Sequence, residues 1–385
     1  MTQQKQKKFN IPLCKPSFNA SELTAVREVL DSGWVAHGPK NKEFESLLRD
    51  FFHVGEVILL NSCASALEAA LVSSGITGEV IIPSFTMSAT ANAVVRAGAT
   101  PVFCDVEWKT GNIDASLVEG LITKKTEAIM PVHFAGFPCD MDAIMSIAKK
   151  HGLRVIEDSA ECIGGKWNGK FAGTFGDAGC FSFWATKNIT TGEGGAILTN
   201  DHAFAERVRA FMSHGISRDT HERHTSSRSW ERDSVMAGVN YRMGDIPAAI
   251  GVVQMKKLSD LNAKRKKHAE YLSASLKEFE TKGMVELPQE TGKAESVWQM
   301  YVIKVRPEVR DNLVLQLREN GIGASVHFDP PVHTQTYYRK NFPAQNLSTT
   351  ERLSKSVITL PLFPDLAAEE LDYIVEKIST ALRNS

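Results

Sequence analysis

A lysine between an apolar segment and a glycine-rich turn is the feature of this sequence that most directly suggests covalent chemistry. Lys187 follows the apolar segment AGCFSFW at 178–184 and precedes TTGEGG at 190–195. Partial burial behind a strand disfavours the charged form of a lysine and leaves a neutral amine that can attack an aldehyde carbon. We therefore expect Lys187 to form a Schiff base. The alternative, an ordinary surface lysine, fits this surrounding pattern poorly.

Two acidic residues end another apolar segment, RVIED at 154–158. A carboxylate at the end of a strand can pair with the protonated nitrogen of a pyridine ring and favour that protonated form. A protonated ring is the stronger electron sink, which is what pyridoxal phosphate chemistry needs. Asp158 is therefore the candidate partner of a pyridine cofactor, and a solvated strand end is the alternative.

A third segment, NSCASAL at 61–67, has the small residues of a turn that opens a helix. Backbone N–H groups at a helix N-terminus bind phosphate because they have no partner within the helix and because the helix dipole is positive there. A capped helix start without a ligand is the alternative. The candidate phosphate-binding residues are Ser62, Cys63, Ala64 and Ser65.

Two further polar segments leave more than one interpretation open. Asn240 and Arg242 lie in GVNYRMGD at 238–245, and they are either ligand-binding residues or polar residues of a helix start. The segment 213–235 is rich in Ser, Arg and His and is expected to be an exposed loop. Its arginines either meet a diphosphate or form a solvated basic surface. These arginines are Arg218, Arg223, Arg228 and Arg232.

The elements that must position these residues are buried strands separated by helices. Near-continuous apolar strands that alternate with helices indicate a mostly parallel sheet covered on both faces, an α/β fold. Ligands of such sheets bind outside the carboxyl ends of the strands. The predicted strands are 57–60, 79–83, 100–106, 128–134, 154–158, 178–184 and 195–199.

The length and the C-terminal pattern indicate two domains. A chain of 385 residues exceeds the usual size of one domain. We expect a large domain at 1–255 with an N-terminal arm, a smaller α+β domain at 256–385, and a linking helix at about 244–275. The other elements predicted for the small domain are a strand at 299–305, a helix at 312–322 and an amphipathic last helix.

The composition is that of an ordinary globular protein, with 43% hydrophobic and 23% charged residues. A net charge of −1 gives no reason to expect nucleic acid or a membrane as a partner. The sequence has no apolar run of about 18 residues, and its N-terminus lacks the apolar core of a signal peptide. The six cysteines form no CxxC pair and no metal-ligand spacing. We therefore expect reduced thiols, no metal site and a cytoplasmic protein.

Taken together, these segments resemble the DegT/DnrJ/EryC1/StrS family of sugar aminotransferases. The family lies within the fold-type I superfamily of pyridoxal-phosphate enzymes, which implies a seven-stranded, mostly parallel sheet and a smaller C-terminal domain. It also implies a homodimer whose active sites are shared between subunits. Besides the segments above, the resemblance includes LDSGWVAHGP at 30–39, PSFT at 83–86, PVHFAG at 131–136, VHF at 326–328, PPVH at 330–333 and LPLFP at 360–364.

The resemblance implies a role for each matching residue. Lys187 matches the Schiff-base lysine, Asp158 the partner of the pyridine nitrogen, and the turn at 63–65 the phosphate site. Ser182 matches a hydroxyl that reaches the phosphate, and Asn240 an asparagine that approaches it from the neighbouring subunit. The candidate substrate residues are Trp34, His327 and Arg242.

Three positions depart from the family pattern. Ala64 stands where a threonine is usual, so backbone N–H groups and Ser65 are expected to bind the phosphate instead. Met87 replaces an aromatic ring on the pyridine face, where its thioether can still contribute about 0.3–1.5 kcal/mol. Glu161 replaces Gln or His near the ring oxygen. Because an ionised Glu161 would be repelled by a phenolate, we expect it to be protonated or turned away.

The reaction that this resemblance implies is the transfer of an amino group from L-glutamate to a keto-sugar, most simply a nucleotide-linked one. The product would enter cell-surface polysaccharides such as lipopolysaccharide, or secondary metabolites. A sugar acid or a cyclitol ketone is an alternative substrate. A sugar dehydratase is disfavoured, because dehydratase relatives replace the lysine with histidine. A pyridoxal-phosphate-binding regulator is disfavoured by the presence of both Lys187 and Asp158.

Overall fold

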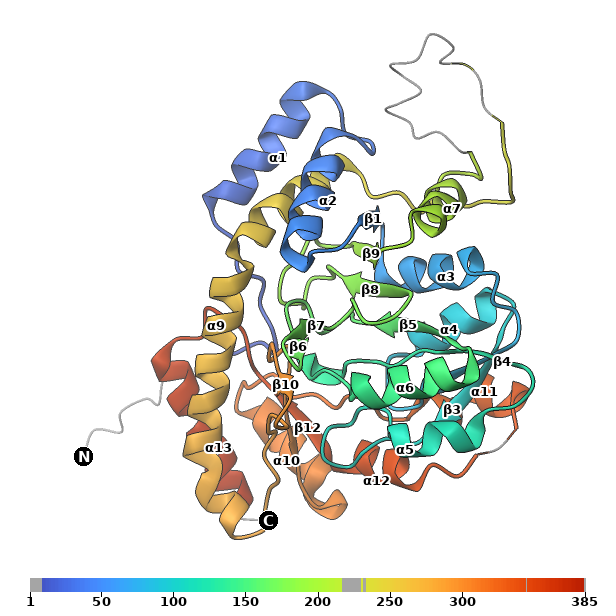
Figure 1. Cartoon of the computed structure of the whole chain (residues 1–385). Helices are drawn as coiled ribbons and strands as arrows, with labels where there is room; N and C mark the ends of the chain where they lie inside the picture. The colour runs from blue at the N-terminus through green and yellow to red at the C-terminus, as the bar shows by residue number, and fades with distance from the viewer. Residues whose placement is uncertain (1–8, 217–229, 231–232, 344, 384–385) are drawn as a thin grey trace.

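A seven-stranded sheet forms the centre of the protein (Figure 1). The computed structural model describes residues 9–216, 230, 233–343 and 345–383. The strand order is β1-β9-β8-β5-β4-β2-β3, and β9 runs antiparallel to both of its neighbours. The strands are β1 (Glu56–Leu60), β2 (Glu79–Pro83), β3 (Thr100–Cys104), β4 (Thr126–Ile129), β5 (Arg154–Asp158), β8 (Ala178–Ser182) and β9 (Gly195–Thr199). The predicted mostly parallel α/β fold is confirmed.

Alternate residues along each strand enter different hydrophobic cores, because successive side chains of a strand point to opposite faces. Ile58 and Leu60 pack with α3 (Cys63–Ser73), α4 (Ser88–Arg96) and α7 (His202–Met212). On the other face, Val57 and Leu59 pack with α2 (Pro39–Phe52) and the start of α9 (Asp245–Thr281). Farther along that second face, α5 (Ala115–Val118) and α6 (Met141–His151) cover β2, β4 and β5.

The register of three strands brings the predicted phosphate turn beside Ser182. Gly195 of β9 pairs with Leu60 of β1 on one side and with Ser182 of β8 on the other. The backbone of Ser62 lies so close that a Cβ on residue 195 would be 2.4 Å from the Ser62 carbonyl carbon. This close approach requires glycine at 195, and it explains part of the glycine-rich turn after Lys187.

Helix α9 (Asp245–Thr281) runs along one side of the molecule and connects two packing environments (Figure 1). Its first half packs in the core of α2 and β1, through residues such as Val252 and Leu261. Its second half, from Ala269 onward, packs in a core formed by the C-terminal elements. The core against which α9 packs therefore changes between Leu261 and Ala269. The predicted domain boundary near residue 256 stays a prediction.

The C-terminal elements are an antiparallel strand pair and helices. They are β11 (Tyr301–Lys304), β12 (Val357–Leu360), α10 (Pro307–Glu319), α11 (Thr336–Asn341), α12 (Ser348–Ser356) and α13 (Ala368–Arg383). The N-terminal segment joins them, because the Ile11 N–H donates to Gly321 O at 2.8 Å and Ile11 lies in their core. The sequence did not indicate this contact between the two ends of the chain.

Several predicted boundaries differ from the structure. The segment 128–134 is a strand only as far as Ile129, because the chain then bends into a 3-10 turn at Phe134–Gly136. The linking helix ends at Thr281 rather than near 275. Helix α1 (Ala20–Ser32), α2, and the small sheet of β6 (Lys166–Trp167), β7 (Lys170–Phe171) and β10 (Ala294–Glu295) were not predicted.

The described residues contain neither a candidate membrane span nor a candidate metal site. Across those ranges, no helix combines the length and the apolar character that crossing a bilayer requires. Within the same ranges, His, Cys, Asp and Glu side chains do not gather in groups of three that could hold a metal ion. The arginines for which a diphosphate contact and a solvated surface were both open lie outside the described residues; they are Arg218, Arg223, Arg228 and Arg232.

Candidate active site

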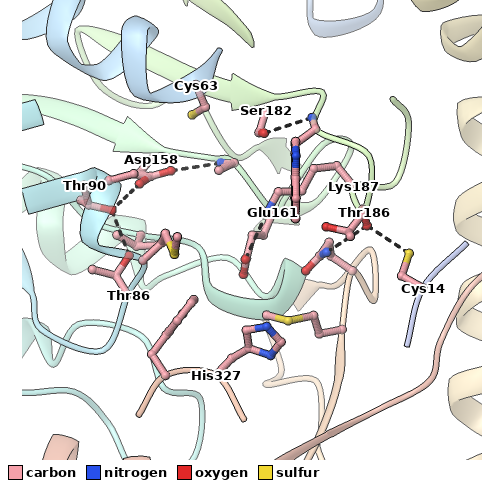
Figure 2. A pocket seen from close by; sticks show the side chains of 18 of the residues that line it. Cys14, Cys63, Thr86, Thr90, Asp158, Glu161, Ser182, Thr186, Lys187 and His327 are labelled. Carbon is pink, nitrogen blue, oxygen red and sulfur yellow. Dashed lines mark hydrogen bonds and ion pairs between the residues drawn. The ribbon is translucent and has the colours of Figure 1, made fainter. Parts of the chain in front are cut away.

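A cavity of about 500 Å³ lies where β1, β5 and β8 end, the edge at which parallel sheets bind ligands. It collects segments far apart in the sequence, from the N-terminal segment at Cys14 to Leu362. Nine of the predicted site residues line it: Ser62, Cys63, Ala64, Met87, Asp158, Glu161, Ser182, Lys187 and His327. Figure 2 shows how several of these side chains converge.

Lys187 enters the cavity from the turn that follows β8. Its backbone N–H donates to Trp184 O at 2.9 Å, which closes that turn. Its amine Nζ lies 3.2 Å from Oε1 of Glu161, and the two side chains are only 14% and 11% exposed (Figure 2). The other oxygen of Glu161 accepts the N–H of Ala135 at 2.8 Å. Glu161 therefore points toward the lysine amine, and the expectation that it is protonated or turned away from the cofactor's phenolate stays a prediction.

Asp158 ends β5 and is almost fully buried, with 4% of its surface exposed. Its Oδ2 accepts the Thr90 hydroxyl at 2.8 Å, and its Oδ1 accepts the Ala160 N–H at 3.2 Å. Burial raises the pKa of Asp158, and these two hydrogen bonds oppose that rise. The Thr90 oxygen is 2.9 Å from the Thr86 hydroxyl. Because Thr90 uses its own proton on Asp158, it accepts the proton of Thr86.

The turn after β1 offers donors to an anion. The Ser62 hydroxyl caps α3 by accepting the N–H of Ser65 at 3.1 Å, and the two hydroxyl oxygens are 2.9 Å apart. The first N–H groups of a helix have no partner within it, and those of Cys63 and Ala64 belong to residues that line the cavity. Burial keeps the pKa of the Cys63 thiol well above its usual value, so this thiol stays neutral beside the turn.

These features fit pyridoxal phosphate. An anion-binding helix start, a carboxylate with free acceptor capacity and a lysine amine border one cavity large enough for a small cofactor. Ser182 stands next to the turn and accepts the Trp184 N–H at 3.3 Å through its hydroxyl oxygen. Its own hydroxyl proton can therefore be donated to a phosphate. The roles assigned to these residues stay predictions.

Four predicted residues do not line this cavity, and one of them, Ser65, belongs to the turn whose earlier residues do. Asn240 is exposed and forms an isolated bridge with Ser213, on the side of the sheet beyond β1. Arg242 bridges to Leu60, and its guanidinium is 3.5 Å from the His214 ring. The Trp34 indole N–H donates to His37 O at 3.2 Å. Contributions of Asn240, Arg242 and Trp34 to a site within their own chain are therefore not supported by the geometry.

His327 closes the cavity from the C-terminal side. Its Nδ1 lies 2.8 Å from the Thr359 hydroxyl, and burial lowers the pKa of the ring. Because the imidazole is kept neutral at physiological pH, it can accept or donate one hydrogen bond to a sugar hydroxyl.

Sequence reasoning missed other residues of the cavity wall. Thr86 ends the PSFT segment and Thr90 follows one helical turn later, so their spacing could have identified the pair. Cys14 and Gln299 carried no signal, because they are far in sequence from the other site residues and only folding brings them to the cavity. Cys14 donates through its thiol to Thr186 O at 3.3 Å, and Gln299 donates to the same carbonyl oxygen at 3.3 Å.

Comparison with known proteins finds relatives along the whole chain. The spore coat polysaccharide biosynthesis protein SpsC of Bacillus subtilis is 35% identical over 391 aligned positions, which cover 99% of each chain. The structure of PseC from Helicobacter pylori, an aminotransferase involved in the biosynthesis of pseudoaminic acid, superimposes with a TM-score of 0.91 at 29% identity. That match covers 98% of this chain and 100% of PseC.

A second structural relative identifies the cofactor. The putative sugar aminotransferase Spr1654 of Streptococcus pneumoniae, solved in a PMP form, matches with a TM-score of 0.91 at 30% identity. The match covers 97% of this chain and 100% of that one. The same protein has been solved in a PLP form, so pyridoxal phosphate is the cofactor of the family. The match to the family pattern extends over residues 16–379. The chain therefore belongs to the DegT/DnrJ/EryC1/StrS aminotransferase family.

Proposed function

We propose that this enzyme transfers an amino group from L-glutamate to the ketone of a nucleotide-linked sugar. The observation that carries the proposal is the convergence of Lys187, Asp158 and the Ser62–Ser65 turn on one cavity. The names of two relatives, which refer to spore coat polysaccharide and to pseudoaminic acid, support a sugar substrate whose product enters surface polysaccharides.

The chain's own residues would hold pyridoxal phosphate at three points. Lys187 would bind it covalently, Asp158 would accept the proton on its ring nitrogen, and the Ser62–Ser65 turn with Ser182 would bind its phosphate. When bound, the cofactor supplies a carbonyl carbon that exchanges amines and a protonated ring that withdraws electrons from the reacting carbon. Thr90 would keep the Asp158 carboxylate oriented, since its hydroxyl donates to Oδ2.

Lys187 would also move the proton on which the transfer depends. Once the amino donor has displaced the lysine, Nζ is an amine within the cavity, and it can take the proton from the α-carbon of the donor. For the sugar it acts in the reverse direction and gives a proton to the carbon that becomes aminated. The low exposure of Lys187 limits exchange of this proton with water.

We also propose that the active site is completed in a homodimer. Asn240, Arg242 and Trp34 do not line the cavity of their own chain, which agrees with a role in the site of a partner subunit. Apolar side chains at the cavity rim are unusually exposed in the single chain, with Met87 at 59% and Trp184 at 48%. A partner subunit would cover them. The free cysteines are in keeping with a cytoplasmic enzyme.

A panel of ketones tests the substrate. The purified enzyme is mixed with L-glutamate and, separately, with nucleotide-linked keto-sugars, a keto sugar acid and a cyclitol ketone, and 2-oxoglutarate and the aminated product are quantified. We expect equal amounts of the two products with a nucleotide-linked keto-sugar, and none with the Lys187→Ala variant. Amination of the free sugar acid or the cyclitol alone would contradict the nucleotide-linked substrate. Unchanged turnover by Lys187→Ala would contradict the whole assignment.

A further inference from the structure

Glu161 is fixed at both of its oxygens. Oε2 accepts the N–H of Ala135, which lies in the 3-10 turn Phe134–Gly136, and the Phe134 N–H in that turn is itself held by Asn112 Oδ1 at 2.9 Å. Oε1 is therefore placed at Lys187 Nζ by an anchored turn (Figure 2). Both oxygens act as acceptors, which is the arrangement of an ionised carboxylate.

The lysine amine has its hydrogen bond with this carboxylate. Within the described part of the chain, Glu161 is the one acceptor within hydrogen-bond distance of Lys187 Nζ. Asp158 and His327 also feel the charge of Lys187, but their hydrogen bonds run to Thr90 and Thr359. A charged pair with so little exposure is weakly screened by solvent, in contrast to the many ion pairs on the surface.

We propose that Glu161 is a positioning residue that holds the free amine of Lys187 as an ammonium inside the cavity. The inference rests on the proposed function of Lys187 and deepens it. Covalent attachment joins Nζ to an aldehyde carbon and releases one water, and it begins from the neutral amine, so the ammonium must first pass one proton to water. Glu161 thus stabilises the ammonium that Lys187 becomes after it has taken the proton of the amino donor, and it slows the attack of the free amine on an aldehyde. A neutral Gln or His, the residues usual at this position, would not attract the ammonium in this way.

The reactivity of the amine in the cofactor-free protein tests the pair. Wild type and Glu161→Gln are treated with a limiting amount of acetic anhydride at one fixed pH, and acetylation of Lys187 is followed by peptide mass spectrometry. Glutamine has the same length and can still accept the Ala135 N–H, so the fold is preserved. We expect Lys187 to be acetylated about tenfold faster in the variant, because a hydrogen bond to a charged group is worth at least that factor.

A surface pair provides the matched control. Lys150 pairs with Glu119, and both side chains are well exposed, at 66% and 45%. Glu119→Gln should change the acetylation of Lys150 by less than about twofold, because exposed ion pairs contribute little. Equal acetylation of Lys187 in wild type and Glu161→Gln, including no detectable acetylation in either, would overturn the proposal.

A second measurement separates this inference from the proposed function. Pyridoxal phosphate is added to the cofactor-free proteins, and the visible absorption band of the lysine-bound cofactor is followed with time. The band should form faster in Glu161→Gln than in wild type. If neither protein forms a band while the acetylation rates differ tenfold, the proposed function is contradicted and the proposed role of Glu161 toward Lys187 is supported. If both proteins form the band at the same rate and are acetylated equally, the proposed role of Glu161 is contradicted and the proposed function is supported.

Discussion

Two adjacent carboxylates on β5 have opposite environments, although both lie in the interior. Glu157 is fully buried and points to the face away from the cavity, where both of its oxygens are occupied. A carboxylate offers about four acceptor positions, so Glu157 has none left for a ligand. Its four donors are the His133 ring Nε2 and the backbone N–H groups of Gly173, Phe175 and Gly176, at 2.6–3.1 Å.

Asp158, the next residue, has two donors and borders the cavity. Its remaining acceptor capacity faces the place where a ligand would lie. The comparison teaches that burial alone does not identify the functional acid of a strand end. The number of hydrogen-bond donors that the protein supplies to each carboxylate identifies it better. A carboxylate with every acceptor position filled stabilises the fold, whereas one with a free acceptor position can bind a proton on a ligand.

The largest effect expected from this comparison is on the activity of Asp158→Asn. Asparagine keeps the shape of the side chain but cannot stabilise a proton on the ring nitrogen of the cofactor. We expect kcat for transamination to fall by about 100- to 10,000-fold, the range that a positioned proton-holding group supplies. Steady-state kinetics with saturating glutamate measure it. A loss of less than about tenfold would contradict the assignment of Asp158 to the cofactor and of Glu157 to the fold.

The second effect is on stability, at Glu157→Gln. The amide presents N–H donors toward backbone N–H groups that now have no acceptor, and His133 loses its anionic partner. We expect the free energy of unfolding, measured in urea, to fall by about 3 kcal/mol. The folded fraction should still show the visible band of the lysine-bound cofactor. A stable variant that lacks this band would instead assign Glu157 to the chemistry.

Thr90 tests how far a hydrogen bond supports Asp158, because its hydroxyl is the one side-chain donor to Asp158 among the described residues. Thr90→Val keeps the size of the side chain and removes the donor, so Asp158 is held less firmly in its ionised form. We expect activity to fall by about tenfold, the value of one hydrogen bond to a charged group, with a shift of the cofactor absorption band. Thr90→Ser restores a hydroxyl and should recover most of both. If Thr90→Ser behaves like Thr90→Val, the effect is one of packing.

The smallest effect is a pH dependence of stability in the cofactor-free enzyme. Burial raises the pKa of folded Asp158 above the ordinary value of 3.8. The stability that this group contributes is therefore fully present below 3.8 and is lost as the pH rises through the raised folded pKa. Asp158→Asn has no carboxyl group at this position, so its stability does not fall with pH for this reason. At pH 7 the cofactor-free variant should be more stable than wild type in urea, and the difference should shrink on acidification. If the variant is less stable than wild type at pH 7, burial of the ionised Asp158 carboxylate does not destabilise the folded protein as we propose.

The sequence predicted the sheet well, because its strands are nearly continuous apolar segments and buried parallel strands leave that pattern. It also predicted polar residues that follow those strands, such as Ser62 and Asp158, and so part of the cavity wall. It did not separate Glu157 from Asp158 by environment, since the donors to Glu157 come from residues 133 and 173–176, which only folding brings together. The pairing of Glu161 with Lys187 was missed for the same reason: it depends on a turn at Ala135 that anchors the carboxylate.

The most direct test of the account is to locate the covalent bond between enzyme and cofactor. The enzyme is loaded with pyridoxal phosphate, reduced with borohydride, digested and analysed by mass spectrometry. We predict that the visible band disappears on reduction and that the reduced cofactor is found on Lys187, with no modified peptide in Lys187→Ala. Modification of another lysine, or a cofactor that leaves unbound after reduction, would contradict the central claim.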